Sequence, residues 1–320
     1  MTTHTGLTTA PIGNTDLVAT RLIYGCMRIV GTWNVAEVDA ERTAQAHAAI
    51  HAALDAGYTH FDHADIYCHT ECERVFGDLL RQSPSLRENM LITTKCGIRF
   101  PGDPTPDATH RYDFSREHII RSCEQSLKRL GIDTIDLYLL HRPDVLMDPL
   151  EIAEAFGQLR QQGKVRHFGV SNFTPPQFDC LQAALDAPLA CNQIQIHPGR
   201  LDPFEDGTLN HLQRLGVTPT AYSPVAGGRF ATGYRVKPDH PEPEKLQALL
   251  DALDAEAEAH NVDRTAITLA WLMKHPAGIQ PIIGSRNPDR IRDAVAADRV
   301  ELSRESWYRI YLAARGKKLP

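Results

Sequence analysis

Long apolar stretches are missing from this chain of 320 residues, and none approaches the roughly 18 residues that a membrane-spanning helix needs. The chain also lacks a basic tract: its formal charge is −6, so neither nucleic acid nor an anionic membrane is an expected partner. The N-terminus, MTTHTGLTTAP, has neither the positive start nor the apolar core of a signal peptide. The seven cysteines are an odd, scattered set, which argues against a disulfide framework. We therefore expect a cytoplasmic protein, and no obligate protein partner is evident.

What the chain does contain is a regular alternation of strand and helix signals, with a period of about 40 residues. Hydrophobic residues make up 42% and charged residues 23%, an ordinary balance for a globular protein with a sizeable core. Several strand signals are apolar without alternation, as in parallel sheets covered on both faces. The strand signals are LIYG (22–25), THFD (59–62), LITTK (91–95), IDLYLL (135–140), KVRHFGVSN (164–172), CNQIQIH (191–197), TPTAYS (218–223) and QPIIGS (280–285).

Helix signals separate these strands. An Ala-rich segment over 41–56 is closed by Gly57, a residue suited to the left-handed position that comes after a helix. Ser115 is an expected N-cap, and the apolar residues after it recur at helical spacing until Gly131 ends the helix. Further helices are expected over 71–81, 149–161, 176–185, 207–215, 251–260, 266–274, from 287 onward, and 303–318.

Eight strand signals, each followed by a helix, match a closed (β/α)8 TIM barrel of the α/β class better than an open doubly wound sheet. No GxGxxG turn comes after the first strand, which weakens the open alternative further. We expect one domain over 1–320, with the barrel at about 20–300 and a C-terminal helix and tail at 301–320. The active site of such a barrel lies at the C-terminal strand ends. Two long connections, 97–114 and 224–243, are typical of functional lids or disordered linkers.

Titratable side chains come after three consecutive strands, at or just beyond the point where each ends: Asp62 with Tyr67, then Lys95, then His141. A free tyrosine has a pKa of about 10, too high for an efficient proton donor near neutrality. A neighbouring ammonium stabilises the phenolate and lowers that pKa, and a carboxylate keeps the ammonium charged and in place. The four side chains therefore predict a site that tunes a proton donor.

Seven short motifs occur in a fixed order: DxAxxY at 62–67, TKxG at 94–97, LHRPD at 140–144, GKVRxFGVSN at 163–172, NQxxxxP at 192–198, AYSP at 221–224 and IIGS at 282–285. Together they resemble the aldo-keto reductase family over nearly the whole chain, closest to its bacterial YdhF-like oxidoreductase branch. The resemblance implies NADPH-dependent reduction of aldehydes or ketones to alcohols. Tyr67 would donate the proton, Lys95 paired with Asp62 would lower its pKa, and His141 would orient the carbonyl oxygen. One departure is Cys68, which stands where the family often has glycine.

By the same resemblance, the cofactor NADP(H) would lie across the ends of the later strands. The carboxamide of its nicotinamide would bind residues 171, 172 and 193, and residue 222 would stack on the nicotinamide face. Residues 227–229 resemble the belt over the cofactor pyrophosphate, where glycines permit close approach and an arginine neutralises phosphate. The expected cofactor residues are Ser171, Asn172, Gln193, Tyr222, Ser223, Gly227, Arg229, Ser285, Arg286 and Arg290.

The stretch GSRNPDR (284–290) is expected to begin a helix after the eighth strand, where backbone amides and the helix dipole attract phosphate. Ser285, Arg286 and Arg290 add a hydroxyl and two cations, which favours the 2′-phosphate of NADPH. Asp289 lies nearby, and an acidic residue that takes the free ribose hydroxyl would favour NADH instead. A plain solvated helix start is the alternative interpretation.

Met27 and Trp33 come after the first strand and are expected to line the substrate mouth together with His141, although Trp33 has the alternative of capping the barrel. Cys96, next to Lys95, is either a reactive thiol or simply a buried one. The composition of these segments names no particular carbonyl compound.

Two other functions remain open. A metal-dependent barrel hydrolase would take its ligands from side chains at or near strand ends, but His60 and Asp62 share one strand face while His63 points away. A cofactor-sensing partner subunit would bind NADPH tightly and turn over carbonyls poorly. The candidate metal ligands are His60, Asp62, His63, Asp65, His141, His167 and His197.

Overall fold

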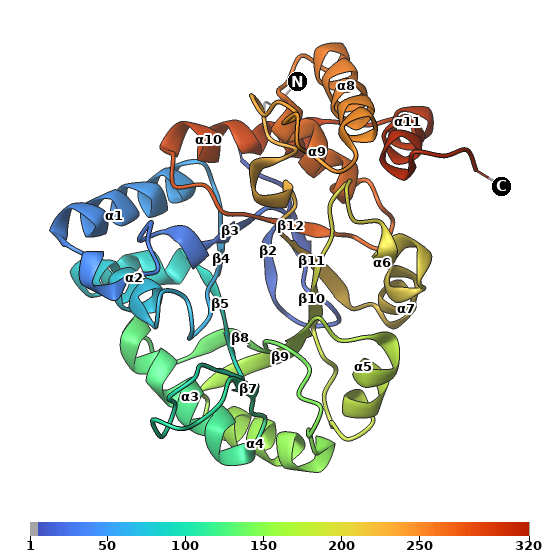
Figure 1. Cartoon of the computed structure of the whole chain (residues 1–320). Coiled ribbons are helices and arrows are strands. Elements are labelled where there is room, and N and C mark those ends of the chain that lie inside the picture. The colour runs from blue at the N-terminus through green and yellow to red at the C-terminus, as the bar shows by residue number, and fades with distance from the viewer. Residues whose placement is uncertain (1–5, 320) are drawn as a thin grey trace.

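Parallel strands close into a barrel and helices surround it, so the (β/α)8 fold expected from the sequence is confirmed (Figure 1). The structure is a computed structural model that describes residues 6–319. The barrel strands are β3 (Ile23–Gly25), β4 (His60–Asp62), β5 (Leu91–Cys96), β8 (Ile135–Leu140), β9 (Val165–Ser171), β10 (Cys191–Gln195), β11 (Thr218–Tyr222) and β12 (Gln280–Ile283). They pair in the order β10–β11–β12–β3–β4–β5–β8–β9, and β9 pairs with β10 to complete the ring.

The helices lie close to where the apolar periodicity predicts them. They are α1 (Ala40–Asp55), α2 (Glu71–Gln82), α3 (Arg116–Leu130), α4 (Pro149–Gln161), α5 (Pro175–Gln182), α6 (Asp202–Glu205), α7 (Thr208–Leu215), α8 (Pro243–Ala259), α9 (Arg264–Met273), α10 (Pro288–Asp293) and α11 (Arg304–Arg315). Ser115 caps α3 by accepting a hydrogen bond from the backbone N–H of His118, as predicted. Gly131 ends that helix with a φ of 67°, a left-handed conformation that glycine adopts without strain. The main difference is α8, which begins several residues earlier than expected.

Side chains inside the barrel change from apolar to polar along its axis. At the N-terminal strand ends, Leu91 belongs to an apolar cluster, and one layer further His60 of β4 lies 2.7 Å from the Thr93 hydroxyl of β5. Successive inward-facing residues of a strand are two apart, so the next layer is formed by Asp62 and Lys95. The apolar cluster comprises Ile12, Leu17, Ala19, Leu91, Leu137, Leu139, Ala190 and Cys191.

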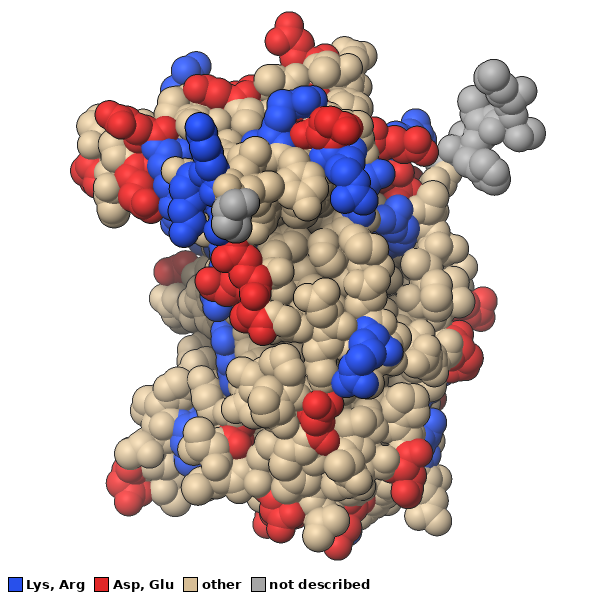
Figure 2. Space-filling view, turned by 90° about the vertical axis from the view of Figure 1, so that its right-hand side faces the viewer, with Lys and Arg blue, Asp and Glu red and all other residues tan. Residues whose placement is uncertain are grey.

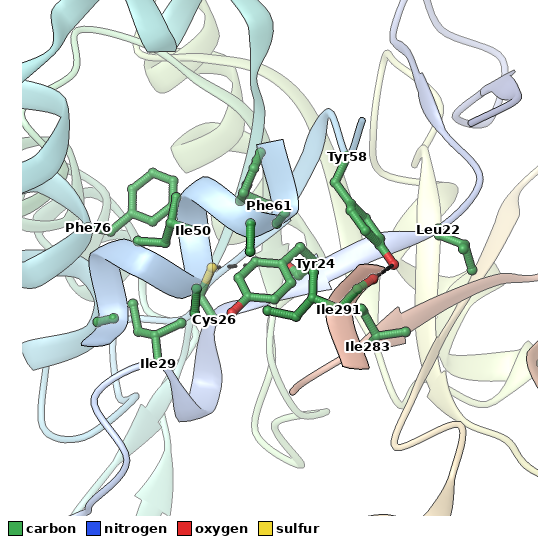
Figure 3. Packing of buried hydrophobic residues seen from close by; sticks show 14 of the residues in the cluster. Leu22, Tyr24, Cys26, Ile29, Ile50, Tyr58, Phe61, Phe76, Ile283 and Ile291 are labelled. Carbon is green, nitrogen blue, oxygen red and sulfur yellow. Dashed lines mark hydrogen bonds between the residues drawn. The ribbon is translucent and has the colours of Figure 1, made fainter. Parts of the chain in front are cut away.

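An apolar cluster outside the barrel fixes the direction in which β4 presents its polar residues. Figure 3 shows Phe61 of β4 packed among side chains from β3 and the surrounding helices. The ring of Phe61 lies 5.9 Å from that of Tyr24 in an edge-on contact, and the Tyr58 hydroxyl donates to the backbone oxygen of Ile291 (Figure 3). Because Phe61 is held outward, its neighbour Asp62 must face the barrel interior.

A hairpin that the sequence analysis did not predict precedes the first barrel strand. Its strands, β1 (Thr9–Pro11) and β2 (Val18–Thr20), pair antiparallel. Between them, Ile12 and Leu17 enter the apolar cluster at the N-terminal strand ends and are almost fully buried. The hairpin therefore closes the end of the barrel opposite the polar layer.

The connection over 97–114 is not an unstructured linker. It contains a short antiparallel pair, β6 (Ile98–Arg99) with β7 (Arg111–Tyr112). The Arg99 guanidinium lies 2.7 Å from Asp113 Oδ2 and ties the two sides of the connection together. The backbone pairing and the buried arginine give this loop a defined path beside the C-terminal strand ends.

The C-terminal helix α11 packs on the outside of the barrel, as predicted (Figure 1). Its Trp307 ring stacks on Trp271 of α9 at 5.1 Å, and each indole N–H donates to the other residue's backbone oxygen.

Figure 2 shows acidic and basic side chains interspersed over the upper part of one face of the molecule. Within residues 6–319, no helix is long and apolar enough to cross a membrane.

Candidate active site

A buried hydrogen-bond network joins Asp62, Tyr67 and Lys95 at the C-terminal end of the barrel. Lys95 Nζ lies 2.7 Å from Asp62 Oδ2, 3.0 Å from Tyr67 Oη and 2.6 Å from the backbone oxygen of His63. The Lys95 side chain is fully buried. The three oxygens accept one hydrogen bond for each of its three ammonium protons. Tyr67 accepts from Lys95 in this arrangement, which leaves the phenolic proton free to be donated elsewhere.

Strand pairing places these side chains next to each other. Asp62 of β4 lies opposite Thr93 of β5, and Lys95 is the next inward residue on β5. The chain then turns back over β5, where the N–H of Asp65 donates to the backbone oxygen of Lys95 at 3.1 Å. This turn carries Tyr67 to the ammonium.

The backbone after Tyr67 is strained. Cys68, His69 and Thr70 all adopt left-handed conformations, with φ values of 46°, 48° and 79°. Each such non-glycine residue costs on the order of 1 kcal/mol. A glycine at position 68 would adopt this φ without strain. The cysteine leaves the path of the turn intact at the cost of local strain.

Burial sets the acidity of Tyr67 more strongly than Lys95 does. Removal from water raises the pKa of Tyr67 to about 12, although the Lys95 ammonium acts to lower it. The lowering by Lys95 that the sequence predicts is therefore present, but the effect of burial, which the sequence did not indicate, outweighs it. Burial also disfavours the charge on Lys95, but Asp62 and Tyr67 hold the pKa of Lys95 above its usual value. At neutral pH the phenol keeps its proton beside a charged ammonium.

His141 lies just beyond β8 and completes the set of four side chains. Its ring centroid lies 6.0 Å from that of Tyr67, with the rings nearly perpendicular at 80°. Burial, together with the charges of Lys95 and Arg142, holds the pKa of His141 well below its usual value. The imidazole is therefore neutral, and its buried Nδ1 has no hydrogen-bond partner within residues 6–319. A neutral imidazole is able to hydrogen-bond a polar ligand beside the phenol.

The side chains expected to bind the nicotinamide carboxamide form one network. Ser171 Oγ donates to the backbone oxygen of Gln193 at 2.9 Å, and Asn172 Nδ2 lies 2.8 Å from Ser171 Oγ. The Tyr222 hydroxyl donates to Asn172 Oδ1 at 2.9 Å, and Gln193 Nε2 donates to Asp62 Oδ1 at 2.9 Å. In the described part of the chain Gln193 Oε1 accepts no hydrogen bond, so it fits a carboxamide N–H.

A cavity of about 340 Å³ opens at the ends of β10 and β11. Its walls include Ser223, Gly227 and Arg229, all expected to contact the cofactor, together with His197 and Arg200. Gly227 has a φ of 68°, and nothing lies within 4 Å of the position that a Cβ would take, so backbone can approach a ligand closely there. Two guanidinium groups in one wall suit an anionic ligand such as a pyrophosphate.

The helix start after β12 differs in one respect from expectation. Asn287 Oδ1 accepts hydrogen bonds from the N–H groups of Asp289 and Arg290, at 2.8 and 3.1 Å. These two backbone amides are therefore already satisfied and do not cradle a phosphate. Arg286 and Arg290 have exposed side chains, and neither guanidinium forms an ion pair with another described residue. Together with Ser285, they remain the candidates for binding a phosphate group.

The comparisons with known proteins agree with this geometry. A model of the aldo/keto reductase family matches residues 21–313. The chain belongs to this family. The oxidoreductase YdhF of Escherichia coli is 42% identical over 301 residues, which cover 94% of this chain and 95% of YdhF. A 6-dehydroglucose reductase of Novosphingobium aromaticivorans is 42% identical over 296 residues, covering 91% of this chain and 92% of its own.

Among solved structures, the thermostable aldo-keto reductase Tm1743 matches with a TM-score of 0.80 at 26% identity, covering 96% of this chain and 100% of Tm1743. The predicted resemblance to the YdhF-like branch is thus confirmed. This aldo-keto reductase is an oxidoreductase, and the tetrad of Asp62, Tyr67, Lys95 and His141 is its candidate catalytic centre.

Arg142 is a residue of this aldo-keto reductase that the sequence analysis missed. Its guanidinium donates to the Tyr222 hydroxyl at 3.4 Å, and its central carbon lies 5.8 Å from the centroid of the Tyr222 ring. The contact holds the ring expected to stack on the nicotinamide, and the same cation lowers the pKa of His141. The signal was its position directly after His141 in the LHRPD motif.

The residues expected at the substrate mouth are less closely tied to the tetrad. Met27, in the short 3-10 helix after β3, is partly buried against the outer apolar cluster. Trp33 is 48% exposed, which argues against the alternative that it caps the barrel. Its place near the open end of the barrel remains a prediction.

The candidate metal ligands of this aldo-keto reductase do not converge. Within residues 6–319, no group of three or more His, Cys, Asp or Glu side chains is arranged to hold a metal ion. His60 is bonded to Thr93, and His63 packs edge-on against Phe76 with the ring centroids 4.4 Å apart. All seven cysteines are free. Cys96 is fully buried, which raises the pKa of its thiol well above the usual range and favours a simply buried thiol over a reactive one.

A larger cavity, of about 400 Å³, lies between α2, α3 and the β6–β7 hairpin. Asp65, His118 and Arg129 belong to its walls, and no member of the tetrad does. The smaller cavity has no tetrad residue in its walls either, but it is the one lined by Ser223, Gly227 and Arg229, which are expected to contact the cofactor.

Proposed function

We propose that this aldo-keto reductase is an NADPH-dependent enzyme that reduces an aldehyde or ketone to an alcohol, with Tyr67 as the proton donor. The observation that carries the proposal is the contact of Lys95 Nζ with both Tyr67 Oη and Asp62 Oδ2. It combines a protonated phenol with a fixed cation that stabilises the phenolate left after proton transfer.

Bound NADPH would supply the hydride that reduces the carbonyl carbon. Tyr67 would transfer its phenolic proton to the carbonyl oxygen, which develops alkoxide character. An alkoxide is a stronger base than a phenolate, so the transfer remains favourable even though burial raises the pKa of Tyr67 to about 12. Lys95 would stabilise the resulting phenolate, and neutral His141 would hydrogen-bond and orient the carbonyl oxygen.

The proposed cofactor contacts lie along the strand ends. Side chains at 171, 172 and 193 would hold the carboxamide, while Tyr222, steadied by Arg142, would cover one nicotinamide face. The cavity lined by Ser223, Gly227 and Arg229 would take the pyrophosphate. Ser285, Arg286 and Arg290 would bind the 2′-phosphate, which favours NADPH over NADH.

The substrate class is proposed from the relatives. Two of them are named 6-dehydroglucose reductases, one at 42% identity and one, from Agrobacterium fabrum, at 37% identity over 304 residues. We therefore propose that sugar aldehydes are the substrates to be tested first. A neutral imidazole and a phenol at the open end of the barrel suit a polar, uncharged carbonyl compound of this kind.

The proposal is tested by following NADPH oxidation with a panel of sugar aldehydes, simple aldehydes and ketones. Turnover that depends on the carbonyl compound supports it. Tight NADPH binding with negligible turnover across the panel would instead favour the cofactor-sensing subunit. A bound stoichiometric metal without NADPH binding would overturn the assignment altogether.

The role of Tyr67 is tested by Tyr67→Phe, which deletes only the phenolic oxygen. We expect kcat to fall by about 10²- to 10⁴-fold, as for loss of a general acid, while the dissociation constant for NADPH stays within about twofold. Tyr112→Phe is the control, because Tyr112 is exposed on β7. Turnover that survives in Tyr67→Phe would remove this residue from its proposed role.

A further inference from the structure

The Asp62 carboxylate is held from two sides of the barrel. Lys95 of the adjacent strand β5 donates to Oδ2 at 2.7 Å, and Gln193 of β10 donates to Oδ1 at 2.9 Å. Strands β4 and β10 are not neighbours in the barrel, so the second contact crosses its interior. Asp62 and Gln193 are 3% and 4% exposed, so this direct contact is made between two buried side chains.

The chemistry of the two partners fixes which way the Gln193 amide points. An ionised carboxylate only accepts hydrogen bonds, so the amide nitrogen must face Asp62 and Oε1 must face elsewhere. The backbone oxygen of the same residue accepts from Ser171 Oγ and from the N–H of Asn172. Gln193 thus contacts Asp62 of the tetrad through Nε2 and belongs to the proposed carboxamide site through its backbone oxygen and Oε1.

We infer that Gln193 is a positioning residue for proton transfer: by donating to Asp62, it controls how strongly the carboxylate draws on Lys95 and hence how well Lys95 stabilises the Tyr67 phenolate. This inference rests on the proposed function of Tyr67. It assigns Gln193 a role beyond the carboxamide contact expected from its family.

The direction of the effect is set by the charges around the two groups. Tyr67 is faced by Lys95, Asp62, His141 and the thiol of Cys26. Asp62 is faced by Lys95, Gln193 and the thiols of Cys26 and Cys191, which burial keeps protonated because it raises their pKa values. Lys95 is thus the one charged partner that both groups share among these.

Without the Gln193 donor, the Asp62 charge would be satisfied by Lys95 alone. The ammonium would then be drawn toward the carboxylate and would stabilise the Tyr67 phenolate less, so the phenol would become less acidic.

The test is the pH dependence of the reverse reaction, alcohol oxidation with NADP⁺, in which the Tyr67 phenolate accepts the proton. Its rate rises with pH below the pKa of the phenol. In Gln193→Met, which keeps the side-chain length but removes the donor, we expect the rising limb of log kcat to move to higher pH by about half a unit or more. This corresponds to a loss of about threefold in kcat at a fixed pH on that limb.

A shorter amide provides a second variant. Gln193→Asn retains the donor group but withdraws it from Asp62, and we expect a displacement in the same direction. Gln280→Met is the control for removing a buried amide from a barrel strand, because Gln280 lies on β12 and makes no contact with Asp62. The rising limb of log kcat in Gln280→Met is expected to superimpose on that of the unaltered protein.

A readout without cofactor separates the inference from the proposed function. In protein labelled with ¹³C at the tyrosine ζ carbon, the signal lost in Tyr67→Phe identifies Tyr67, and its ionisation should begin at higher pH in Gln193→Met. If the rising limb of log kcat and the Tyr67 titration of Gln193→Met coincide with those of the unaltered protein, or move to lower pH, the role of Gln193 is overturned. An unaltered protein that turns over no carbonyl overturns the proposed function instead, while the titration still decides the contact.

Discussion

At the scale of single residues, the buried part of the molecule around the tetrad holds a charged Lys95 and several neutral imidazoles, His60 inside the barrel and His63 outside it against Phe76. Lys95 is charged because Asp62 and Tyr67 compensate it. Burial, and to a smaller extent repulsion from the Lys95 charge, lowers the pKa of His60 and of His63 to about 3. Neither nitrogen of the His63 ring has a partner within residues 6–319. The imidazoles are therefore tolerated only without a proton, which makes the fold sensitive to acid.

The sign of this sensitivity is testable with His63→Leu. The unfolded chain binds a proton at His63 below a pKa of about 6.5, whereas the folded chain does so only near 3, so acidification through this window favours unfolding. At pH 5 the histidine should cost about 2 kcal/mol of unfolding free energy relative to pH 7.5. His63→Leu should remove that part of the pH dependence in denaturant titrations at both pH values. His51→Leu, at an exposed site on α1, should leave the pH dependence unaltered, and equal slopes in all three proteins would contradict the argument.

The identities of the tetrad residues were predictable because each belongs to a short local motif at a strand end. The acidity of Tyr67 was not, because it depends on how completely the neighbouring chain excludes water. The sequence indicated the Lys95 cation correctly but gave no measure of the burial that outweighs it. The contact of Gln193 with Asp62 was equally hidden, since it joins residues 131 positions apart across the barrel.

At the scale of elements, the site depends on the segment that leaves the C-terminal end of each strand. The short helix α10 has its first amides satisfied by Asn287, so any phosphate affinity there must come from the arginine side chains around it. Arg292 of the same helix is paired with Asp289 at 2.9 Å, whereas Arg286 and Arg290 have no such partner in the described chain. Within the described residues, Arg286 and Arg290 are therefore unpaired cations at this helix start, and Arg292 is an ion-paired control on the same helix.

This difference predicts cofactor choice. Arg290→Glu and Arg286→Glu should each raise KM for NADPH by about 10- to 100-fold, the worth of one charge-assisted hydrogen bond, with little change in KM for NADH. Arg292→Glu should affect both cofactors equally and weakly. Steady-state kinetics with each cofactor checks this. A similar rise for NADPH and NADH, or none for NADPH, would show that the 2′-phosphate is not bound here.

Elements were predictable in proportion to the local signal that they carry. The six-residue strand β8 and helix α3, with its cap and closing glycine, could be derived from a short window. The N-terminal hairpin could not, because β1 and β2 have three residues each and are stabilised by contacts with strands far along the chain. The pair β6–β7 was missed for the same reason, since its two-residue strands leave no periodic pattern.

At the scale of the whole molecule, the two ends of the barrel have separate tasks. The N-terminal strand ends are filled with apolar side chains and covered by the hairpin, while the C-terminal ends hold the polar network. Along β4 and β5 the layer of His60 and Thr93 lies between them, whereas Leu139 and Cys191 of the same apolar cluster adjoin Lys95 and Asp62. A change in the apolar end should therefore alter stability without altering the chemistry.

Leu17 and its neighbour Val18 make this separation testable. Leu17 is 2% exposed within the apolar cluster, whereas Val18 is 61% exposed. Leu17→Ala should lower the free energy of unfolding by about 2–5 kcal/mol, through lost burial and the cavity left behind, and Val18→Ala by less than about 0.5 kcal/mol. Both should keep kcat/KM per folded molecule within about twofold of the unaltered protein, because neither side chain reaches the polar layer. If Leu17→Ala instead lowered kcat while the fold stayed intact, packing at the N-terminal end of the barrel would have to influence the geometry of the tetrad at the other end.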